Sequence, residues 1–331
     1  MKRTLIIAEA GVNHNGCLET AKKLVEKAAD AGADIVKFQT FSSEKMTTSE
    51  ASLADYQSRT IDEHSQLNML KKLELTREMH EVLIEHCKIC GIEFLSTAFD
   101  TDSFDFLSQC GIKRHKIASG EITNLPLLKK IGSAGLPVIM STGMSELVEI
   151  DHAVNILDQA GLNRSQLTLL QCTSEYPAPD EEANLRVMET LKNRYDVAVG
   201  YSDHTLGIAL SIGAVALGAT VIEKHFTLDR KMKGPDHKAS IEPAELAELI
   251  NSIRRIESAL GQSNKSVTRS EAKNRSIARK SIVAAKPIKK GECFSELNLA
   301  VKRPARGRSP MEWLSIIGKK AERDYQIDEC I

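Results

Sequence analysis

Eight short apolar runs, each followed by a helix-sized segment, constrain the fold of this 331-residue chain more than any other feature. The runs are rich in β-branched residues and show no polar alternation, which is typical of strands buried on both faces of a parallel sheet. The segments between them carry apolar residues at helical spacing. We therefore predict eight strands, at residues 5–11, 35–40, 93–99, 115–121, 137–144, 167–174, 197–204 and 220–226.

A strict alternation of strand and helix, repeated eight times, predicts an α/β fold of the (β/α)8 TIM-barrel type. An open, doubly wound sheet is the alternative, but no G-x-G-x-x-G motif follows any of the predicted strands. The loop after the second predicted strand, residues 41–70, is long and polar, which makes it a candidate lid over the site.

The composition of the chain changes after the barrel. The last predicted barrel helix ends at Gly261, and residues 262–280 are rich in Ser, Asn, Lys and Arg, which is typical of a linker. Residues 281–331 begin with an apolar S-I-V-A-A run and a K-K-G turn, which indicates a small β-rich module. We therefore predict a barrel domain over 1–261, a linker over 262–280 and a second domain over 281–331.

Composition and charge exclude several classes of protein. The formal net charge is −1 and aromatic residues make up 4 %, so neither a basic field nor a stacking platform favours a nucleic-acid partner. No apolar run reaches the roughly 18 residues of a membrane span, and Glu9 comes too early for a signal peptide. The seven cysteines are an odd number in a long chain, which argues against a disulfide scaffold. We expect a cytoplasmic protein with no membrane partner.

Polar and charged side chains gather at the carboxyl ends of the predicted strands, which is where TIM barrels place their active sites. Buried unpaired charges are costly, so we expect the lysines and carboxylates among them to face the open mouth of the barrel. In strand order these residues are Glu9; Lys37 and Gln39; Ser96 and Thr97; Lys116, Ser119 and Glu121; Ser141 and Thr142; Thr173 and Ser174; Ser202, Asp203 and His204; and Glu223, Lys224 and His225.

Part of this set predicts an anion site with acid–base carboxylates. Ammonium groups supply charge and hydroxyls supply directed donors, a combination that suits a small polyanion carrying phosphate or carboxylate. Glu9 and Glu121 lie at the same mouth and are candidates for proton transfer. The residues that would bind the anion are Lys37, Lys116, Ser119, Ser141 and Ser202.

His204 and His225 close two neighbouring strands and form a candidate metal pair. Imidazoles in oxygen-rich surroundings suit a divalent ion such as Mn²⁺ or Zn²⁺. The turn at residues 233–237 follows the last strand, so we expect Asp236 and His237 to reach over the mouth. The basic run at residues 302–308 is either a solvated charge run or an arginine offered to the barrel mouth of another subunit.

Seven motifs run in order along the barrel: IAEAGVNHNG (7–16), VKFQT (36–40), SGE (119–121), QCTSEYP (171–177), GYSDHT (200–205), EKHFTL (223–228) and GPDH (234–237). The tail adds ARKSIVA (278–284), KRP (302–304) and IGK (317–319). Together they resemble the sialic acid (nonulosonic acid) synthase family over essentially the whole chain. Three positions depart from the family pattern: Ala98 and Ala118 stand in place of prolines, and Ala305-Arg306-Gly307 stands in place of G-N-G.

The resemblance implies a TIM barrel followed by a small antifreeze-like SAF domain, assembled as a domain-swapped homodimer. It implies a sialic acid synthase reaction, in which phosphoenolpyruvate condenses with N-acetylmannosamine or a related 2-acetamido sugar. The products would be an N-acetylneuraminate-type nonulosonic acid and phosphate. The metal it implies is Mn²⁺, with Mg²⁺ or Co²⁺ as alternatives.

The resemblance also assigns roles to residues. His204 and His225 would hold the metal and, with Glu9 and Glu121 as acid–base carboxylates, would be catalytic. Arg303, from the SAF domain of the partner subunit, would contact the N-acetyl group of the sugar. The phosphoenolpyruvate site would consist of Lys37, Thr97, Lys116, Ser119, Ser141 and Ser202. The other sugar-binding residues would be Gln39, Tyr176 and Asp236.

Three other interpretations stay open. A synthase of N,N′-diacetyllegionaminate would use 2,4-diacetamido-2,4,6-trideoxymannose, and short motifs do not separate the two sugars because both share the aldehyde end. A barrel metal hydrolase is more remote, since we would expect H-x-H on the first strand where the chain has Glu9-Ala10-Gly11. A non-enzymatic scaffold that carries a binding domain is opposed by the charged strand ends.

Overall fold

The computed structural model describes residues 3–53 and 65–331 of the chain. The chain divides into two compact units, Met1–Gly261 and Gln262–Ile331, and each unit is described by itself. Within the described ranges, no helix has both the length and the apolar character that a membrane span requires.

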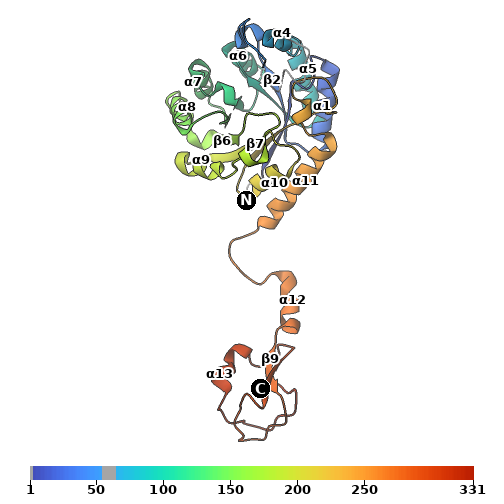
Figure 1. The fold of residues 1–331 in the computed structure, drawn as a ribbon, viewed down its shortest axis with the longest axis vertical. Coiled ribbons are helices and arrows are strands. Elements are labelled where there is room, and N and C mark those ends of the chain that lie inside the picture. Colours follow the sequence, from blue (N-terminus) through green and yellow to red (C-terminus); the bar gives the residue numbers. More distant parts are fainter. Residues whose placement is uncertain (1–2, 54–64) are drawn as a thin grey trace. The chain divides into compact units, whose positions relative to one another are not determined.

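The first unit is a closed barrel of eight parallel strands, with helices around the outside (Figure 1). Neighbouring strands follow the order β3-β2-β1-β8-β7-β6-β5-β4, and β3 and β4 at the two ends of that order also lie against each other. The prediction of a TIM barrel is therefore confirmed. The strands are β1 (Leu5–Gly11), β2 (Ile35–Thr40), β3 (Glu93–Ala98), β4 (His115–Ile117), β5 (Val138–Ser141), β6 (Leu167–Cys172), β7 (Ala198–Asp203) and β8 (Val221–His225).

All eight predicted strands form, but most end earlier than predicted. The largest difference is at the fourth strand, which was predicted to run to residue 121, where the structure has strand β4 to Ile117 and then the 3-10 turn η1 (Ser119–Glu121). The main-chain pairing of β4 with β5 stops at Ile117, and the polar residues beyond it fold into a turn. The apolar runs located the strands, whereas their ends depend on pairing between neighbours.

The helices of the first unit cover the barrel and fill the loops. The outer helices are α1 (Leu18–Asp30), α5 (Arg77–Cys90), α6 (Thr101–Gln109), α7 (Leu125–Ser133), α8 (Leu147–Gln159), α9 (Val187–Tyr195), α10 (Ala209–Ala216) and α11 (Pro243–Leu260). Two short helices, α2 (Ser43–Met46) and α4 (Gln66–Lys71), lie in the loop after β2. The 3-10 turns η2 (Arg164–Gln166), η3 (Asp180–Glu182) and η4 (His237–Ala239) follow α8, β6 and β8.

The barrel interior is closed by an apolar plug, on which the polar residues of the site are stacked. The plug consists of Ile7, Ile35, Leu95, Ile139, Leu170 and Val221. Side chains two residues apart on a strand point to the same face, so the next inward position on each strand lies one layer higher. Those positions are Glu9, Lys37, Thr97, Ser141, Cys172 and Glu223. The same alternation therefore builds an apolar base and a polar layer above it.

The intervening strand positions face the helices instead of the mouth. Lys224 is one of them, and its Nζ lies 2.9 Å from the Asp203 carboxylate, with both side chains almost completely buried. Asp203 also accepts hydrogen bonds from the hydroxyls of Thr205 and Ser211. The expectation that every lysine and carboxylate at the strand ends faces the mouth was therefore wrong for this pair, because strand alternation turns it toward helix α10.

We expect Lys224→Met to destabilise the barrel by about 3–5 kcal/mol, because it leaves the Asp203 carboxylate buried without its cation. Denaturant unfolding of the purified protein measures this change. The matched control is Lys23→Met on the exposed face of α1, for which we expect a change of less than about 0.5 kcal/mol. Equal effects of the two substitutions would contradict a stabilising role for the buried pair.

The second unit has its own small core. Strands β9 (Ser281–Ala284) and β10 (Leu299–Lys302) pair antiparallel, followed by η5 (Pro310–Glu312) and α13 (Trp313–Ile316). Helix α12 (Arg269–Ala278) lies within the segment that we predicted as a linker, and none of its residues is buried. The second unit includes this segment, since it begins at Gln262. The core consists of Ile282, Ala284, Ile288, Phe294, Leu299, Ile316 and Ala321.

Candidate active site

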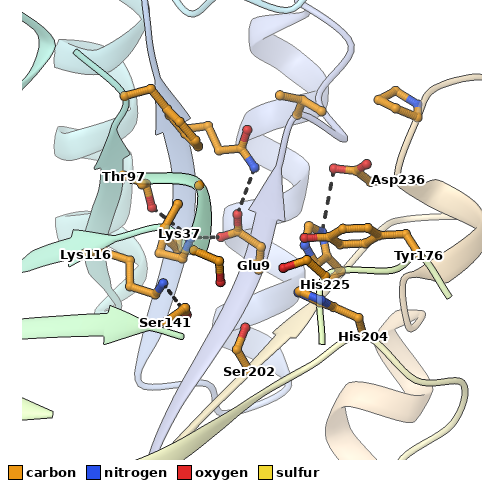
Figure 2. A pocket seen from close by; sticks show the side chains of 18 of the residues that line it. Glu9, Lys37, Thr97, Lys116, Ser141, Tyr176, Ser202, His204, His225 and Asp236 are labelled. Carbon is orange, nitrogen blue, oxygen red and sulfur yellow. Dashed lines mark hydrogen bonds and ion pairs between the residues drawn. The ribbon is translucent and has the colours of Figure 1, made fainter. Parts of the chain in front are cut away.

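A cavity of about 400 Å³ lies at the carboxyl ends of the barrel strands (Figure 2). All but two of the side chains to which the sequence assigned a catalytic or binding role line it. They are Glu9, Lys37, Gln39, Thr97, Lys116, Ser119, Ser141, Tyr176, Ser202, His204, His225 and Asp236. Their juxtaposition is observed, whereas their individual roles stay predictions.

Lys37 is the central cation of the cavity floor. Its Nζ lies 2.7 Å from the Glu9 carboxylate and 3.6 Å from the Glu223 carboxylate, and it donates a hydrogen bond to Thr97 Oγ1 at 3.0 Å. Gln39 Nε2 donates to the other oxygen of Glu9 at 3.3 Å. Figure 2 shows Lys37 and Glu9 pointing toward each other across the floor. A buried cation held by several oxygens is therefore fixed in position.

Lys116 is the second buried cation and comes from strand β4. Its Nζ donates to Ser141 Oγ at 2.7 Å and to the carbonyl of Ile117 at 3.0 Å, and it lies 3.6 Å from Glu223. Ser202 donates a hydrogen bond to Glu223 at 2.9 Å. Glu223 thus lies between the two ammonium groups and links them into one network.

We predicted Glu223 to lie at a strand end but assigned it no role. The spacing along β8 could have placed it in the cavity, because Val221, Glu223 and His225 alternate along the strand and must share its inward face. Cys172 was missed for the same reason: it stands two residues beyond the plug residue Leu170 and lines the cavity.

The carboxyl groups of Glu9 and Glu223 differ in the direction in which their pKa is shifted. Burial raises the pKa of the Glu9 carboxyl, Lys37 only partly offsets this, and the charge of Glu223 adds to the rise. Burial acts in the same direction on Glu223, but the ammonium groups of Lys116 and Lys37 hold its pKa below the usual range. Glu223 is therefore the permanent counter-ion of the lysines, whereas Glu9 is the carboxyl suited to proton transfer.

The two predicted metal ligands lie side by side. The ring centroids of His204 and His225 are 5.3 Å apart, and the ring of Tyr176 lies 4.2 Å from that of His204. His204 Nδ1 lies 2.7 Å from the carbonyl oxygen of Thr173, a hydrogen bond that requires the proton on Nδ1, so that in the neutral form of the ring Nε2 carries the lone pair. Metal-binding histidines commonly have such a backbone partner.

His225 and Asp236 complete this side of the cavity. Burial, together with the neighbouring His204, lowers the pKa of His225 well below its ordinary value and keeps the imidazole neutral. His225 Nδ1 is buried without a hydrogen-bond partner and lies 3.8 Å from the Asp236 carboxylate. Across residues 3–53 and 65–331, no group of three or more His, Cys, Asp or Glu side chains encloses a metal site. A divalent ion at this place would have the two imidazoles as its protein ligands and would take its remaining ligands from water or substrate oxygens.

Two residues with assigned roles do not line this cavity. Glu121 lies in η1, where its carboxylate accepts a hydrogen bond from Asn124 Nδ2 at 2.7 Å. Because the chain leaves the strand at Ile117 and turns in η1, strand alternation does not carry Glu121 to the cavity, although Ser119 at the start of the turn lines it. Arg303 belongs to the second unit, where it follows β10 and is exposed.

His237 does not reach over the mouth as we expected, because its ring is used to hold the loop. Its Nδ1 lies 2.7 Å from Thr227 Oγ1, and its Nε2 lies 3.3 Å from Asn15 Oδ1. Gly234 lies against that ring, where a Cβ atom would approach Cδ2 of His237 to 2.6 Å. This contact positions Pro235 and Asp236, which do line the cavity.

The loop after β2 also differs from its prediction. Residues 54–64 lie outside the described residues, but the flanking parts form α2 and α4. The loop was predicted to be polar, yet Met46, Met69 and Leu70 turn apolar side chains to the cavity. Composition averaged over the loop concealed this, since Gln66 is the one polar residue of these two short helices that lines the cavity.

The barrel and its cavity place the protein in the class of barrel enzymes that act on a small anionic substrate. Within that class the chain belongs to the NeuB family, whose model matches residues 24–265, and a SAF domain matches residues 279–331. The resemblance to the sialic acid synthase family and the expectation of an enzyme are confirmed. Membership in this family argues against the metal-hydrolase and scaffold interpretations.

Individual relatives cover most or all of the chain. The N,N′-diacetyllegionaminic acid synthase of Campylobacter jejuni is 56% identical, over 100% of this chain and 99% of that protein. The Legionella pneumophila protein of the same name is 46% identical, over 95% of this chain and 89% of its own length. Among solved structures, the N-acetylneuraminic acid synthetase of Leptospira borgpetersenii superposes with a TM-score of 0.74 at 36% identity, over 82% of this chain and 90% of that one.

Proposed function

We propose that this protein is an N,N′-diacetyllegionaminate synthase, which condenses phosphoenolpyruvate with 2,4-diacetamido-2,4,6-trideoxymannose and releases phosphate. The observation that carries the proposal is the identity of 56% and 46% with two proteins of that name, against 36% with an N-acetylneuraminic acid synthetase. N-Acetylmannosamine, the sugar that sequence analysis put first, is therefore the less supported substrate.

The lysine-rich floor supports the phosphoenolpyruvate part of the proposal. Lys37 and Lys116 supply charge, and the hydroxyls of Thr97, Ser141 and Ser202 lie on the same floor. In the reaction, C3 of phosphoenolpyruvate bonds to the aldehyde carbon, whose oxygen takes up a proton. A water oxygen adds to C2, the bond from C2 to the phosphate oxygen breaks, and loss of the proton of the added water leaves a ketone. Glu9, whose pKa is raised by burial, is the side chain suited to these proton transfers.

We further propose that His204 and His225 hold a divalent ion, Mn²⁺ first and Mg²⁺ or Co²⁺ as alternatives. The imidazole of His225, which its lowered pKa keeps neutral, and that of His204, whose Nδ1 is bound to the carbonyl of Thr173, support this choice. A bound ion of this kind supplies Lewis-acid polarisation of the aldehyde. The chain's own contribution is to orient the sugar through Gln39, Tyr176 and Asp236, which line the cavity together with the histidines.

A phosphate-release assay with phosphoenolpyruvate and each of the two sugars tests the proposed function. We expect kcat/KM for the 2,4-diacetamido sugar to exceed that for N-acetylmannosamine by about tenfold or more, because the extra acetamido group adds binding contacts. The control is the same enzyme with phosphoenolpyruvate alone. A higher kcat/KM for N-acetylmannosamine would contradict the proposal and restore a sialic acid synthase.

The proposal includes a domain-swapped homodimer in the cytoplasm, in which Arg303 of the partner subunit binds the N-acetyl group. The resemblance supports the dimer, and the exposed position of Arg303 on the second unit allows such a contact. All seven cysteines are free, which supports a reducing compartment. We expect Arg303→Ala to raise the KM for the sugar more than that for phosphoenolpyruvate, by about tenfold or more, as expected for loss of a charged hydrogen bond.

Co-expression of two impaired chains, assayed at a sugar concentration well below the wild-type KM, decides whether Arg303 acts on its own barrel or on that of the partner. One chain carries Arg303→Ala and the other carries Lys116→Met in the floor. If the small domains are swapped, each mixed dimer has one barrel with Lys116 that receives an intact Arg303, and about a quarter of wild-type activity returns. Activity no higher than that of the two chains mixed after separate purification would contradict the swap.

A further inference from the structure

One side of the cavity is apolar, in contrast to its charged floor. We call this side the apolar wall, and it consists of Val12, Met46, Met69, Leu70, Leu73 and Phe99. These residues follow strands β1, β2 and β3. In the closed order of eight strands, β2 and β3 lie across the barrel from β6 and β7, whose ends carry Tyr176 and His204. The part of the apolar wall that follows β2 and β3 therefore faces Tyr176 and His204 across the floor.

The apolar wall is part of a packed cluster. Val12, Met69, Leu70 and Leu73 are buried together with Phe41, while Met46 and Phe99 pack against them. The rings of Phe41 and Phe99 meet edge to face at 6.2 Å. Among the described residues of α4, Gln66 is the one polar side chain that lines the cavity beside the apolar wall. It accepts a hydrogen bond from Thr47 at 2.9 Å. The apolar surface is thus held in place by packing within the protein itself.

The reaction fixes one end of the sugar. Its aldehyde carbon must lie between the histidines and the floor, because it bonds to phosphoenolpyruvate held by Lys37 and Lys116. The remaining carbons then extend across the cavity toward the apolar wall. A hydroxyl placed against that wall would lose its water partners without gaining a hydrogen bond, whereas a methyl group would be buried favourably.

We propose that the apolar wall selects sugars that carry a methyl group, instead of a hydroxymethyl group, at C6. This inference deepens the proposed function and rests on the sugar orientation given there. It makes the C6 position a determinant of specificity that is separate from the acetamido group at C4. Because an apolar pocket rejects an added hydroxyl only moderately, the expected preference for the 6-deoxy sugar is about 10- to 100-fold in kcat/KM.

Two pairs of sugars that differ only at C6 test the inference. The first pair is 2,4-diacetamido-2,4,6-trideoxymannose and 2,4-diacetamido-2,4-dideoxymannose. The second is 2-acetamido-2,6-dideoxymannose and N-acetylmannosamine. We expect the 6-deoxy member to be preferred in both pairs. Equal kcat/KM within both pairs would overturn the inference.

Substitutions in the apolar wall test whether its residues cause the preference for a 6-deoxy sugar. Met46→Gln and Met69→Gln introduce polar groups of similar length, and we expect each to reduce the C6 preference by about tenfold. Met46 is half-buried, so its variant is expected to fold even if substitution of the buried Met69 does not. Met46→Leu and Met69→Leu are the apolar controls and should keep the preference. An unchanged preference in a folded Met46→Gln enzyme would contradict the role of the wall.

Different results would contradict the proposed function and the inference about the apolar wall. If N-acetylmannosamine proves the better sugar overall while 6-deoxy sugars are still preferred within each pair, the proposed product is wrong and the wall inference stands. If the 2,4-diacetamido series is preferred but its two members are used equally, the proposed function stands and the wall inference is wrong.

Discussion

His204→Ala and His225→Ala proteins are expected to fold and to lose at least about 10³-fold in kcat, because polarisation of the aldehyde contributes several kcal/mol to the transition state. Each variant removes one of two neighbouring imidazoles, and the described residues offer no third ligand of the same kind at this place. Stimulation of the residual activity by divalent ions should disappear as well.

Metal binding gives a readout that does not depend on turnover. We expect the wild-type protein to bind Mn²⁺, measured as the loss of the free-ion signal in electron paramagnetic resonance, and either alanine variant to bind it at least about tenfold more weakly. His152→Ala, which removes an exposed histidine from α8, is the matched control and should bind like the wild type. Wild-type affinity in His225→Ala would remove this residue from the metal site.

The barrel could be predicted from the sequence because one rule repeats eight times. Buried parallel strands leave continuous apolar runs such as that around Ile7, and the polar residue two positions later, Glu9, marks the layer above the plug. The same rule, applied along β8, would have identified Glu223 from His225. Period-two alternation along a strand therefore predicts the floor of the site as well as the fold.

What could not be predicted depends on where strands end and on what loops pack against. Glu121 was assigned to the cavity because a strand was extended through it, but pairing with β5 stops at Ile117. The apolar wall was missed because Met46 and Met69 are separated by 22 residues of mostly polar loop, and only the packed cluster brings them together. We predicted Lys224 to face the mouth because of its charge alone. Its neighbour Glu223 faces the mouth, so strand alternation turns Lys224 to the opposite face, where it pairs with Asp203.

The second large effect is expected for Lys116→Met. Loss of this buried ammonium should lower kcat/KM for phosphoenolpyruvate by about 10²- to 10³-fold, which corresponds to about 3–4 kcal/mol for one partner of a buried charge pair. The KM for the sugar should change by less than about threefold, because Lys116 lies on the floor beside Ser141. Lys224→Met should show the reverse pattern, with lower stability and little change in KM for phosphoenolpyruvate, although both lysines are similarly buried.

A second substitution separates electrostatics from packing at Lys116. Without this cation, Glu223 keeps Lys37 as a charged partner but repels an incoming anion. Adding Glu223→Gln removes the repulsion while Lys37 remains, so the double variant should recover about tenfold of the lost kcat/KM for phosphoenolpyruvate. Steady-state kinetics at fixed sugar concentration measure this recovery. If the double variant instead lost activity further, Lys116 would act by holding Glu223 in place, and the anion site would have to be assigned to other residues of the floor.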